Sequence, residues 1–498
     1  MYGAKVRLRY AGFVSFFSML FSVLTGLAFT TIVTRKLTPT DFGFWQVISV
    51  TITYFAVVTN IVGYWAPRFI ARGENVAKSS LVYNTVAGGL ATLAYIPVSY
   101  FISSTLNLDL FYFILFSPQV FLSYVSMALE GVNRGCAPQH IGYSFIIYEI
   151  VKVASAYALI VLVKQSLVGA ILAVIAAQLS KVLYLLIVTL PLVKEGSLKL
   201  EHIVRFTKLA WIPLYCNIAS YVNTLDVYII VYFTQTTLPV ALFRVAFILS
   251  SIVFYSASFS SALYPRILAK KAGKDVEETL RLTLMFAIPM TTGLIVLAKP
   301  VLCIFGVKYL AAYELLIILT AVFLILSTSR VFETVILGAE EVDLNKKARF
   351  KEYLKSNLFL LPTVQYLVHG AYLLLLAVVM ALKPLDAALA WSIVFAASKI
   401  ALTLWEYTYS KKLVEFKLPF KSIAKYLLAS TVMAAVLLAL KADKVIEVKI
   451  FTLMLKLTPY LFIGIVVYFA VLLAIDKYSR ELLKGTLNLA KNTLTTFF

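Results

Sequence analysis

Long apolar runs dominate the sequence, and each is about as long as a bilayer is thick. A helix needs about 20 apolar residues to cross the hydrocarbon core. The runs cover 11–34, 42–66, 81–103, 110–129, 141–163, 167–190, 209–233, 239–263, 282–304, 312–337, 358–382, 387–409, 426–440 and 450–475. Because lipid offers no partner to a backbone N–H or C=O group, each run is expected to be helical. The sequence therefore predicts an all-α polytopic membrane protein with about 14 transmembrane helices.

The composition agrees with a membrane protein and argues against a soluble one. Of the 498 residues, 61% are apolar and 14% are charged, whereas soluble domains have about 45–50% and about 25%. The 45 Lys and Arg against 24 Asp and Glu give a net charge of +21, but the basic residues sit mainly in the short segments between the runs. We therefore interpret the excess as membrane topology and expect no nucleic-acid partner. The three cysteines and three histidines show no ligand spacing, so neither a metal site nor another cofactor is predicted.

The distribution of basic residues predicts the orientation. With 14 helices, about 30 Lys and Arg fall on the side of the N-terminus and about nine on the other side, which makes the first side cytoplasmic by the positive-inside rule. The opposite loops hold Arg35, Lys36, Lys164, Lys299, Lys308, Lys383, Lys441, Lys444 and Lys449. We expect a multi-pass protein of the cell membrane with both termini in the cytoplasm.

Similar motifs in the two halves suggest an internal repeat. Pro67-Arg68-Phe69-Ile70-Ala71-Arg72 follows the second run, and Pro265-Arg266-Ile267-Leu268-Ala269-Lys270 follows the eighth. Further matches are Pro39 with Pro239 and Leu129-Glu130-Gly131 with Ile336-Leu337-Gly338. Both copies would start on the same side, so they are related by an axis along the membrane normal, and a substrate site is expected between them. The alternative is that the Pro-Arg motif is a chance pattern at helix ends.

These features predict four parts of the chain. They are an N-terminal six-helix lobe (1–195), a C-terminal six-helix lobe (196–412), two additional transmembrane helices (413–475) and a cytoplasmic tail (476–498). In the tail, leucines alternate with basic residues at helical spacing. This pattern is typical of an amphipathic helix on an anionic membrane surface.

A family resemblance rests on two motifs. The run Arg35-Lys36-Leu37-Thr38-Pro39-Thr40-Asp41-Phe42-Gly43-Phe44-Trp45, after a first run that contains Gly26, resembles the start of polysaccharide flippases of the multidrug, oligosaccharidyl-lipid and polysaccharide exporter superfamily. The element Leu129-x-Gly131-x-x-Arg134 is also similar, and the plan of 6 plus 6 plus 2 helices matches over the whole chain.

The resemblance implies a transporter and no enzyme. It would flip a polyprenyl-phosphate- or diphosphate-linked oligosaccharide from the cytoplasmic to the outer leaflet by alternating access, for cell-surface polysaccharide or glycoprotein glycan assembly. Membrane lipids and glycosyltransferases of the same pathway are the implied partners. The first run lacks the Lys or Arg that some flippases of lipid-linked precursors keep there, which makes a peptidoglycan precursor a less favoured substrate.

Charged residues inside the runs are the candidate site. A charge at the bilayer centre costs about 2.5–3.5 kcal/mol on insertion scales, so it is usually retained for a purpose. Lys152, Lys181 and Lys399 lie near the middle of the fifth, sixth and twelfth runs, where ammonium groups could contact a lipid diphosphate. The alternative is neutralisation within the protein, because Glu149 precedes Lys152 by one helical turn. Glu149 is also a candidate for ion coupling.

Other charges lie nearer the ends of the runs. Asp226 and Arg244 lie at similar depths near the outer ends of the seventh and eighth runs, where they could form a gate or a static salt bridge. Arg244 is also a candidate substrate contact. Arg330, Glu333 and Glu406 lie within about two turns of the cytoplasmic end, where we expect them to snorkel to the surface.

Two other functions remain open. An ion-coupled multidrug or small-molecule antiporter of the same superfamily would need carboxylates at the bilayer centre. Only Glu149 is a candidate for such a carboxylate. A membrane-embedded glycosyltransferase would need paired carboxylates in a large loop outside the membrane, and the acidic cluster Glu340-Glu341-x-Asp343 falls on the wrong side for an exported polymer.

Overall fold

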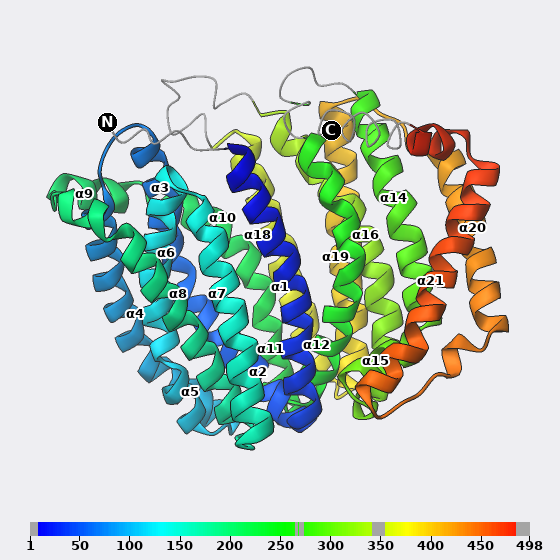
Figure 1. Cartoon of the computed structure of the whole chain (residues 1–498), viewed down its shortest axis with the longest axis horizontal. Helices are drawn as coiled ribbons and strands as arrows, with labels where there is room; N and C mark the ends of the chain where they lie inside the picture. Colours follow the sequence, from blue (N-terminus) through cyan, green and yellow to red (C-terminus); the bar gives the residue numbers. More distant parts are fainter. Residues whose placement is uncertain (1–7, 264–266, 268–272, 341–353, 485–498) are drawn as a thin grey trace, which may run out of the picture. The chain divides into compact units, whose positions relative to one another are not determined.

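The protein is α-helical throughout the part of the chain that the structure describes. This computed structural model describes residues 8–263, 267, 273–340 and 354–484, and no strand occurs within them (Figure 1). Twelve helical segments are long and apolar enough to cross a membrane, and a bent pair raises the number to 13. Helix α1 (Leu8–Lys36) covers the first predicted run, so all fourteen runs coincide with helical structure. The prediction of an all-α polytopic fold is confirmed.

The chain forms two compact units, of which the first comprises Met1–Ala241 and His369–Ala387. After α1 its helices are α2 (Pro39–Ala56), η1 (Val57–Thr59), α3 (Asn60–Ala71), α4 (Ala77–Leu106), α5 (Leu110–Phe116), α6 (Pro118–Cys136), α7 (Gln139–Ala156), η2 (Tyr157–Leu162), α8 (Leu167–Glu195), α9 (Leu200–Lys208), α10 (Trp211–Val222), η3 (Asn223–Leu225), α11 (Asp226–Thr234) and part of α18 (Asn357–Ala381). Helix α7 packs along both α1 and α8, while α6 packs along α3, α4 and α8.

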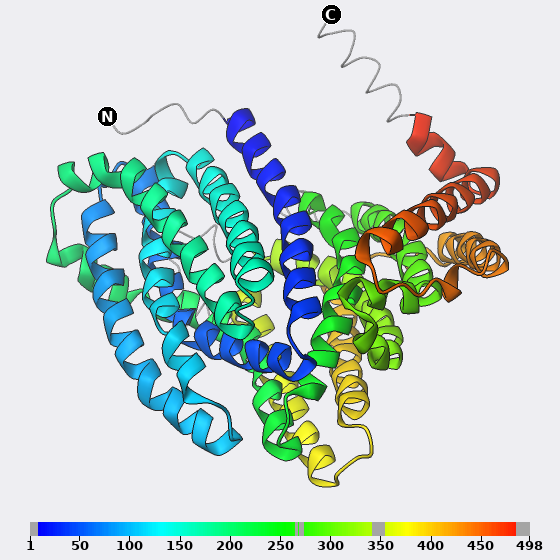
Figure 2. The same cartoon turned by 60° about the horizontal axis from the view of Figure 1, so that its bottom comes forward.

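The second unit comprises Leu242–Val368 and Ala388–Phe498. It contains most of α12 (Leu238–Ser250), η4 (Ser251–Ala262), α14 (Gly273–Val296), α15 (Ala298–Phe305), η5 (Val307–Ala312), α16 (Tyr313–Gly338), the first part of α18, α19 (Ala387–Leu413), α20 (Phe420–Ala439), η7 (Ala442–Lys444) and α21 (Ile450–Ile475). The two additional helices, α20 and α21, lie side by side, and α20 packs on α14 (Figure 1 and Figure 2). These two units differ from the predicted lobes, since α10 and α11 belong to the first unit. The lobes are defined by the sequence repeat and stay a prediction.

The longer of the two motifs that carry the family resemblance spans the end of α1 and the start of α2. Thr38 is the N-cap, because its Oγ1 accepts a hydrogen bond from the Asp41 N–H at 3.1 Å, and Pro39 occupies the first helical position. A Cβ on Gly43 would lie only 2.0 Å from the carbonyl oxygen of Thr237. The Thr237 Oγ1 in turn donates to the Thr40 carbonyl at 2.6 Å. Glycine is therefore required where α2 packs on the turn that precedes α12.

Within the described residues, five residues other than glycine end helices in the left-handed conformation. They have φ values between 50° and 62° and are Asn107, Lys164, Gln235, Lys383 and Lys441. They follow the third, fifth, seventh, eleventh and thirteenth predicted helices, all of which end on the predicted outer side. The left-handed residue lets the chain turn back into the next helix within a few residues. Four of these five connections are therefore tight, since the next α-helix begins within four residues of the left-handed residue. After Lys441, α21 begins nine residues later.

Some predictions fall on residues that the structure does not describe. Most of the second copy of the Pro-Arg motif, namely 265–266 and 268–270, lies outside the described residues. The same holds for 341–343 of the acidic cluster and for the tail beyond 484.

Candidate functional site

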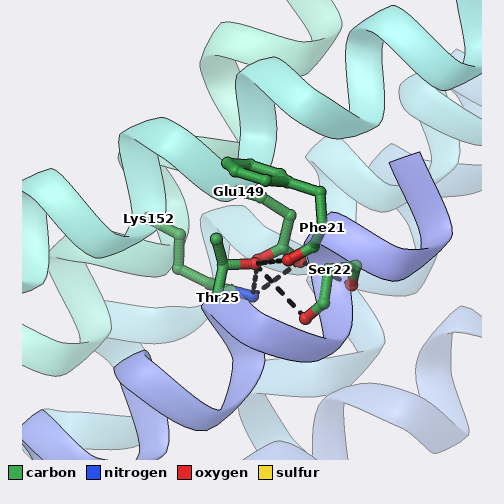
Figure 3. Close-up of polar contacts among 5 residues, drawn as sticks. All are labelled: Phe21, Ser22, Thr25, Glu149 and Lys152. Atoms are coloured by element: carbon green, nitrogen blue, oxygen red, sulfur yellow. Dashed lines mark hydrogen bonds and ion pairs between the residues drawn. The ribbon is translucent and has the colours of Figure 1, made fainter. Parts of the chain in front are cut away.

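Glu149 and Lys152 form a buried ion pair in the first unit. They lie one turn apart on α7, and the Lys152 Nζ is 2.8 Å from Oε1 and 2.7 Å from Oε2 of Glu149. Two hydroxyl groups of α1 also donate hydrogen bonds to this carboxylate. Ser22 Oγ donates to Oε1 at 3.1 Å, and Thr25 Oγ1 donates to Oε2 at 2.5 Å (Figure 3). Glu149 is 2% exposed, and its satisfied oxygens tie α7 to α1. The pairing considered as an alternative for Lys152 is present.

Lys181 has a carboxylate partner that sequence reasoning missed. On α8, its Nζ lies 2.8 Å from Oε1 of Glu130 on α6. Ser126 Oγ donates to the same oxygen at 2.9 Å, and an Arg134 nitrogen lies 4.0 Å from the other oxygen. Glu130 was used only as part of a repeat motif. Glu130 could have been found as an acidic residue on the otherwise apolar, buried face of its helix.

One aromatic ring lies beside the ammonium groups of both Lys152 and Lys181. The Nζ atoms of Lys152 and Lys181 are 5.0 Å and 5.9 Å from the ring centroid of Tyr148. A cation near an aromatic face is attracted by the ring quadrupole. The structure thus brings two of the three predicted lysines together around Tyr148, and each is neutralised by its own carboxylate.

Lys399 occupies a comparable place in the second unit. It follows the left-handed residue Lys383 by 16 residues, while Lys181 follows the left-handed residue Lys164 by 17. Lys399 is 8% exposed, and its Nζ lies 5.0 Å from the ring centroid of Phe395 on the same helix. The sixth helix of each predicted copy therefore buries a lysine at an equivalent position.

The expectation that Glu406 snorkels to the surface is wrong. Glu406 on α19 is 2% exposed, and its carboxylate accepts a hydrogen bond from Ser329 on α16. Glu406 lies on the face of α19 that packs inside the unit, so its side chain points to α16 and not to the membrane surface. Arg330, by contrast, is exposed and pairs with Glu333 at 2.5 Å. The described chain therefore buries Glu130 and Glu406 as well as Glu149. That Glu149 is the only carboxylate near the bilayer centre stays a prediction.

The proposed gate residues lie in different units. Asp226 begins α11 and accepts a hydrogen bond from the Tyr372 hydroxyl on α18 at 2.7 Å. Arg244 is on α12, with its guanidinium carbon 5.7 Å from the ring centroid of Phe247. Their pairing stays a prediction.

A cavity of about 370 Å³ lies within the first unit. Residues of α1, α2, α5, α6, α7 and α8 line it, among them Lys152. Aromatic rings, including Trp45 and Tyr148, form part of the wall, and Gln119 contributes a buried amide. Sequence reasoning used Trp45 only as the end of the family motif. It did not single out Gln119, although a glutamine inside an apolar run is a detectable signal.

Comparisons with known proteins give structural matches only. No family model and no curated protein matches the sequence. The solved structure of the lipid II flippase MurJ in an inward closed conformation matches with a TM-score of 0.67 and 16% identity, over 94% of this chain and 99% of that chain. An inward-facing multidrug resistance MATE family transporter of the MOP superfamily matches with a TM-score of 0.60 and 14% identity, over 79% of this chain and 95% of that chain. The chain therefore has the fold that MurJ shares with the MATE transporters of the MOP superfamily, which confirms the resemblance at the level of the fold.

Proposed function

We propose that this protein is a flippase that moves a lipid-linked oligosaccharide, on a polyprenyl phosphate or diphosphate, from the cytoplasmic to the outer leaflet by alternating access. The observation that carries the proposal is the match to the lipid II flippase over 94% of the chain, against 79% for the MATE transporter. The oligosaccharide rests on the sequence motif around Pro39. Both termini are proposed to be cytoplasmic, in the cell membrane, with glycosyltransferases of the pathway as partners.

The buried lysines are proposed to receive the lipid phosphate. Lys181 and Lys399 occupy equivalent helices of the two predicted copies, so each alternating state would keep one ammonium group near the phosphate. Leaving the head-group layer costs the phosphate its hydration, and positive charge in a partly dry site offsets that cost. Glu130 holds Lys181 at 2.8 Å in the state described. A phosphate that displaces Glu130 would exchange one anion for another, so Lys181 would not be left unpaired.

The remaining charges are assigned to contact and gating. We propose Lys152 and Arg244 as further substrate contacts, and Asp226 and Glu149 as gating or ion-coupling groups. Glu149 suits a coupling role because it joins α1 to α7 through Ser22 and Thr25. A proton on this carboxylate would weaken its bond to Lys152 and loosen the two helices.

An ion-coupled antiporter of the same superfamily is the second candidate. The buried carboxylates Glu130, Glu149 and Glu406 favour it, since such groups can bind protons or cations. Reconstituted full-length protein separates the two functions. The flippase should move a polyprenyl-diphosphate oligosaccharide to the leaflet where impermeant periodate oxidises it, and the antiporter should exchange ethidium for protons.

Variants connect the flipping assay to the lysines. Lys181→Gln and Lys399→Gln should each reduce the flipping rate at least about tenfold, since a lost charge contact is worth more than about 1.4 kcal/mol. Arg at either position should keep partial activity, because the charge remains while its shape changes. Lys412→Gln, at an exposed lysine of α19, is the control and should flip at the wild-type rate. Wild-type rates for both buried variants would contradict the phosphate role, and ethidium exchange without flipping would favour the antiporter.

A further inference from the structure

The cavity of the first unit presents hydrogen-bond acceptors that lack donors. Four residues with hydroxyl groups line it, and three of these groups, all but that of Tyr148, give their protons to their own helices. Ser49 donates to the Trp45 carbonyl at 2.7 Å, Thr53 to the Ser49 carbonyl at 2.9 Å, and Ser123 to the Gln119 carbonyl at 2.7 Å. Their oxygens are left as acceptors. The fourth acceptor is the amide oxygen of Gln119, which is buried and receives no hydrogen bond.

Among the unpaired buried polar atoms of the described residues, the amide oxygen of Gln119 is the one that lines this cavity. Gln119 is 9% exposed, and a buried polar atom without a partner costs about 1–3 kcal/mol. Native proteins leave few such atoms, and each calls for an explanation. Because Gln119 lines the cavity, a hydrogen-bond donor bound there would satisfy it. The ligand must therefore carry donors.

The charge of the cavity selects against ions. Lys152 contributes one positive charge, but Glu149 neutralises it at 2.7 Å. A phosphate would find the only cation among the lining residues already neutralised, and the three hydroxyl groups could donate to it only by giving up the bonds to their own helices. A cation would face the ammonium group of Lys152. Of its three N–H donors, two are directed to Glu149, and the third remains for a ligand oxygen. A neutral ligand with several hydroxyl groups fits both the acceptors and this donor.

The aromatic residues of the cavity wall suit a ligand with an apolar face. Trp45, Phe116 and Tyr148 line it, with the Trp45 and Phe116 ring centroids 5.3 Å apart. Aromatic walls with a few placed polar groups are typical of small-molecule sites. The volume of about 370 Å³ lies within the range of small-molecule sites, about 300–1,000 Å³.

We propose that this cavity binds one uncharged sugar ring, with a face against Trp45 and its hydroxyl groups donating to Gln119, Ser123, Ser49 and Thr53. The inference rests on the proposed function for the source of the ring, which is the oligosaccharide of the transported lipid. It separates the two chemical parts of the substrate, since the phosphate is excluded from this cavity. Lys152 then contacts a sugar oxygen rather than the phosphate.

Saturation-transfer NMR on the full-length protein tests the proposal. The protein is placed in nanodiscs, because alkyl maltoside detergents would supply sugar. The probes are the methyl glycosides of glucose, galactose, mannose and N-acetylglucosamine, with methyl phosphate and tetramethylammonium as charged probes. At least one glycoside should bind at millimolar concentration, and neither charged probe should compete with it.

Matched variants locate the binding. Gln119→Met keeps the side-chain length and removes the acceptor, so it should weaken glycoside binding about fivefold or more, the effect of one lost hydrogen bond. Ser123→Ala should weaken it less. Gln178→Met is the control, because Gln178 is equally buried on α8 but does not line the cavity.

The outcomes separate this inference from the proposed function. No glycoside binding to the wild type, competition by methyl phosphate, or unchanged binding by Gln119→Met would each overturn the sugar site, even if lipid flipping is measured. Glycoside binding that Gln119→Met weakens supports the site. If flipping of the lipid-linked oligosaccharide is then absent, the proposed function fails while the sugar site remains.

Discussion

The pair between Lys181 and Glu130 has a measurable signature in stability. Removing one member of a buried ion pair leaves an uncompensated charge and costs about 3–5 kcal/mol, whereas removing both costs much less. We therefore expect Glu130→Gln to lower the melting temperature of the protein in nanodiscs, and Glu130→Gln with Lys181→Gln to restore most of it. Flipping by Lys181→Gln is best compared with this double variant, which keeps the charge balance.

The control for this cycle is an exposed ion pair. Lys477 and Glu481 lie 3.7 Å apart with side chains 83% and 64% exposed. Solvent and salt screen such a pair, so the same single and double changes there should leave the melting temperature nearly unchanged. Additive losses at Lys181 and Glu130 would show that the two charges do not depend on each other.

The residues that sequence reasoning missed share a physical cause. The pair of Glu149 and Lys152 could be predicted from the sequence, because side chains three residues apart lie on the same face of a helix. Glu130 and Lys181 stand on α6 and α8, and which faces of two helices meet is decided by packing. Glu406 was assigned to the surface because the sequence gives its distance from the end of the helix. The sequence does not show which side of the helix packs against a neighbour. The charges of the candidate site were thus predictable, but most of their partners were not.

Asp476 should stabilise the start of the last described helix, 477–484. Its carboxylate accepts hydrogen bonds from the Ser479 N–H at 3.1 Å and the Ser479 hydroxyl at 2.8 Å, and from Lys425 of α20 at 2.9 Å. Asp476→Ala should cost about 0.5–2 kcal/mol, the range for a lost N-cap. Faster hydrogen exchange of the 477–484 amides would show it. Glu481→Ala, in the same helix, should not have this effect.

The contribution of Asp476 should depend on pH. Burial alone would raise its pKa, but the hydrogen bonds from Lys425 and Ser479 outweigh burial and hold the pKa below its ordinary value. A carboxyl group with a lowered pKa in the folded state stabilises that state above its unfolded pKa and loses this effect as the pH falls through the folded value. The exchange difference between wild type and Asp476→Ala, corrected for intrinsic rates, should therefore be full at pH 7 and narrow in acid below the ordinary carboxyl range. A constant difference would contradict the linkage.

Element boundaries were less predictable than the elements themselves. Helix α14 begins at Gly273, nine residues before the predicted run at 282, because its first turns carry Lys274, Asp275 and other charged residues that lower the hydropathy. The second predicted helix is divided by η1 and the seventh by η3. Hydropathy measures affinity for lipid and does not register such changes in helical geometry.

The topology of the whole molecule can be tested by labelling. In a protein without Cys136, Cys216 and Cys303, single cysteines at Lys164 and Lys383 should react with an impermeant thiol reagent added outside cells. Both positions are exposed in tight turns on the predicted outer side. Cysteines at Lys274 and Lys412 should react only after the membrane is permeabilised, since the positive-inside rule makes their side cytoplasmic. Equal labelling of all four in intact cells would refute the orientation.

The left-handed lysines are positions at which substitution by glycine should stabilise the protein. A side chain in the left-handed conformation crowds its own backbone at a cost of about 1–2 kcal/mol, which glycine does not pay. Lys164, Lys383 and Lys441 adopt this conformation at φ values of 62°, 50° and 56°, and their side chains are exposed. Glycine at these three turns would relieve strain at well-separated sites, whose effects add. It would also remove three of the nine or so basic residues on the predicted outer side. The same changes that stabilise the protein would therefore increase the difference in Lys and Arg between the two sides, which directs insertion into the membrane.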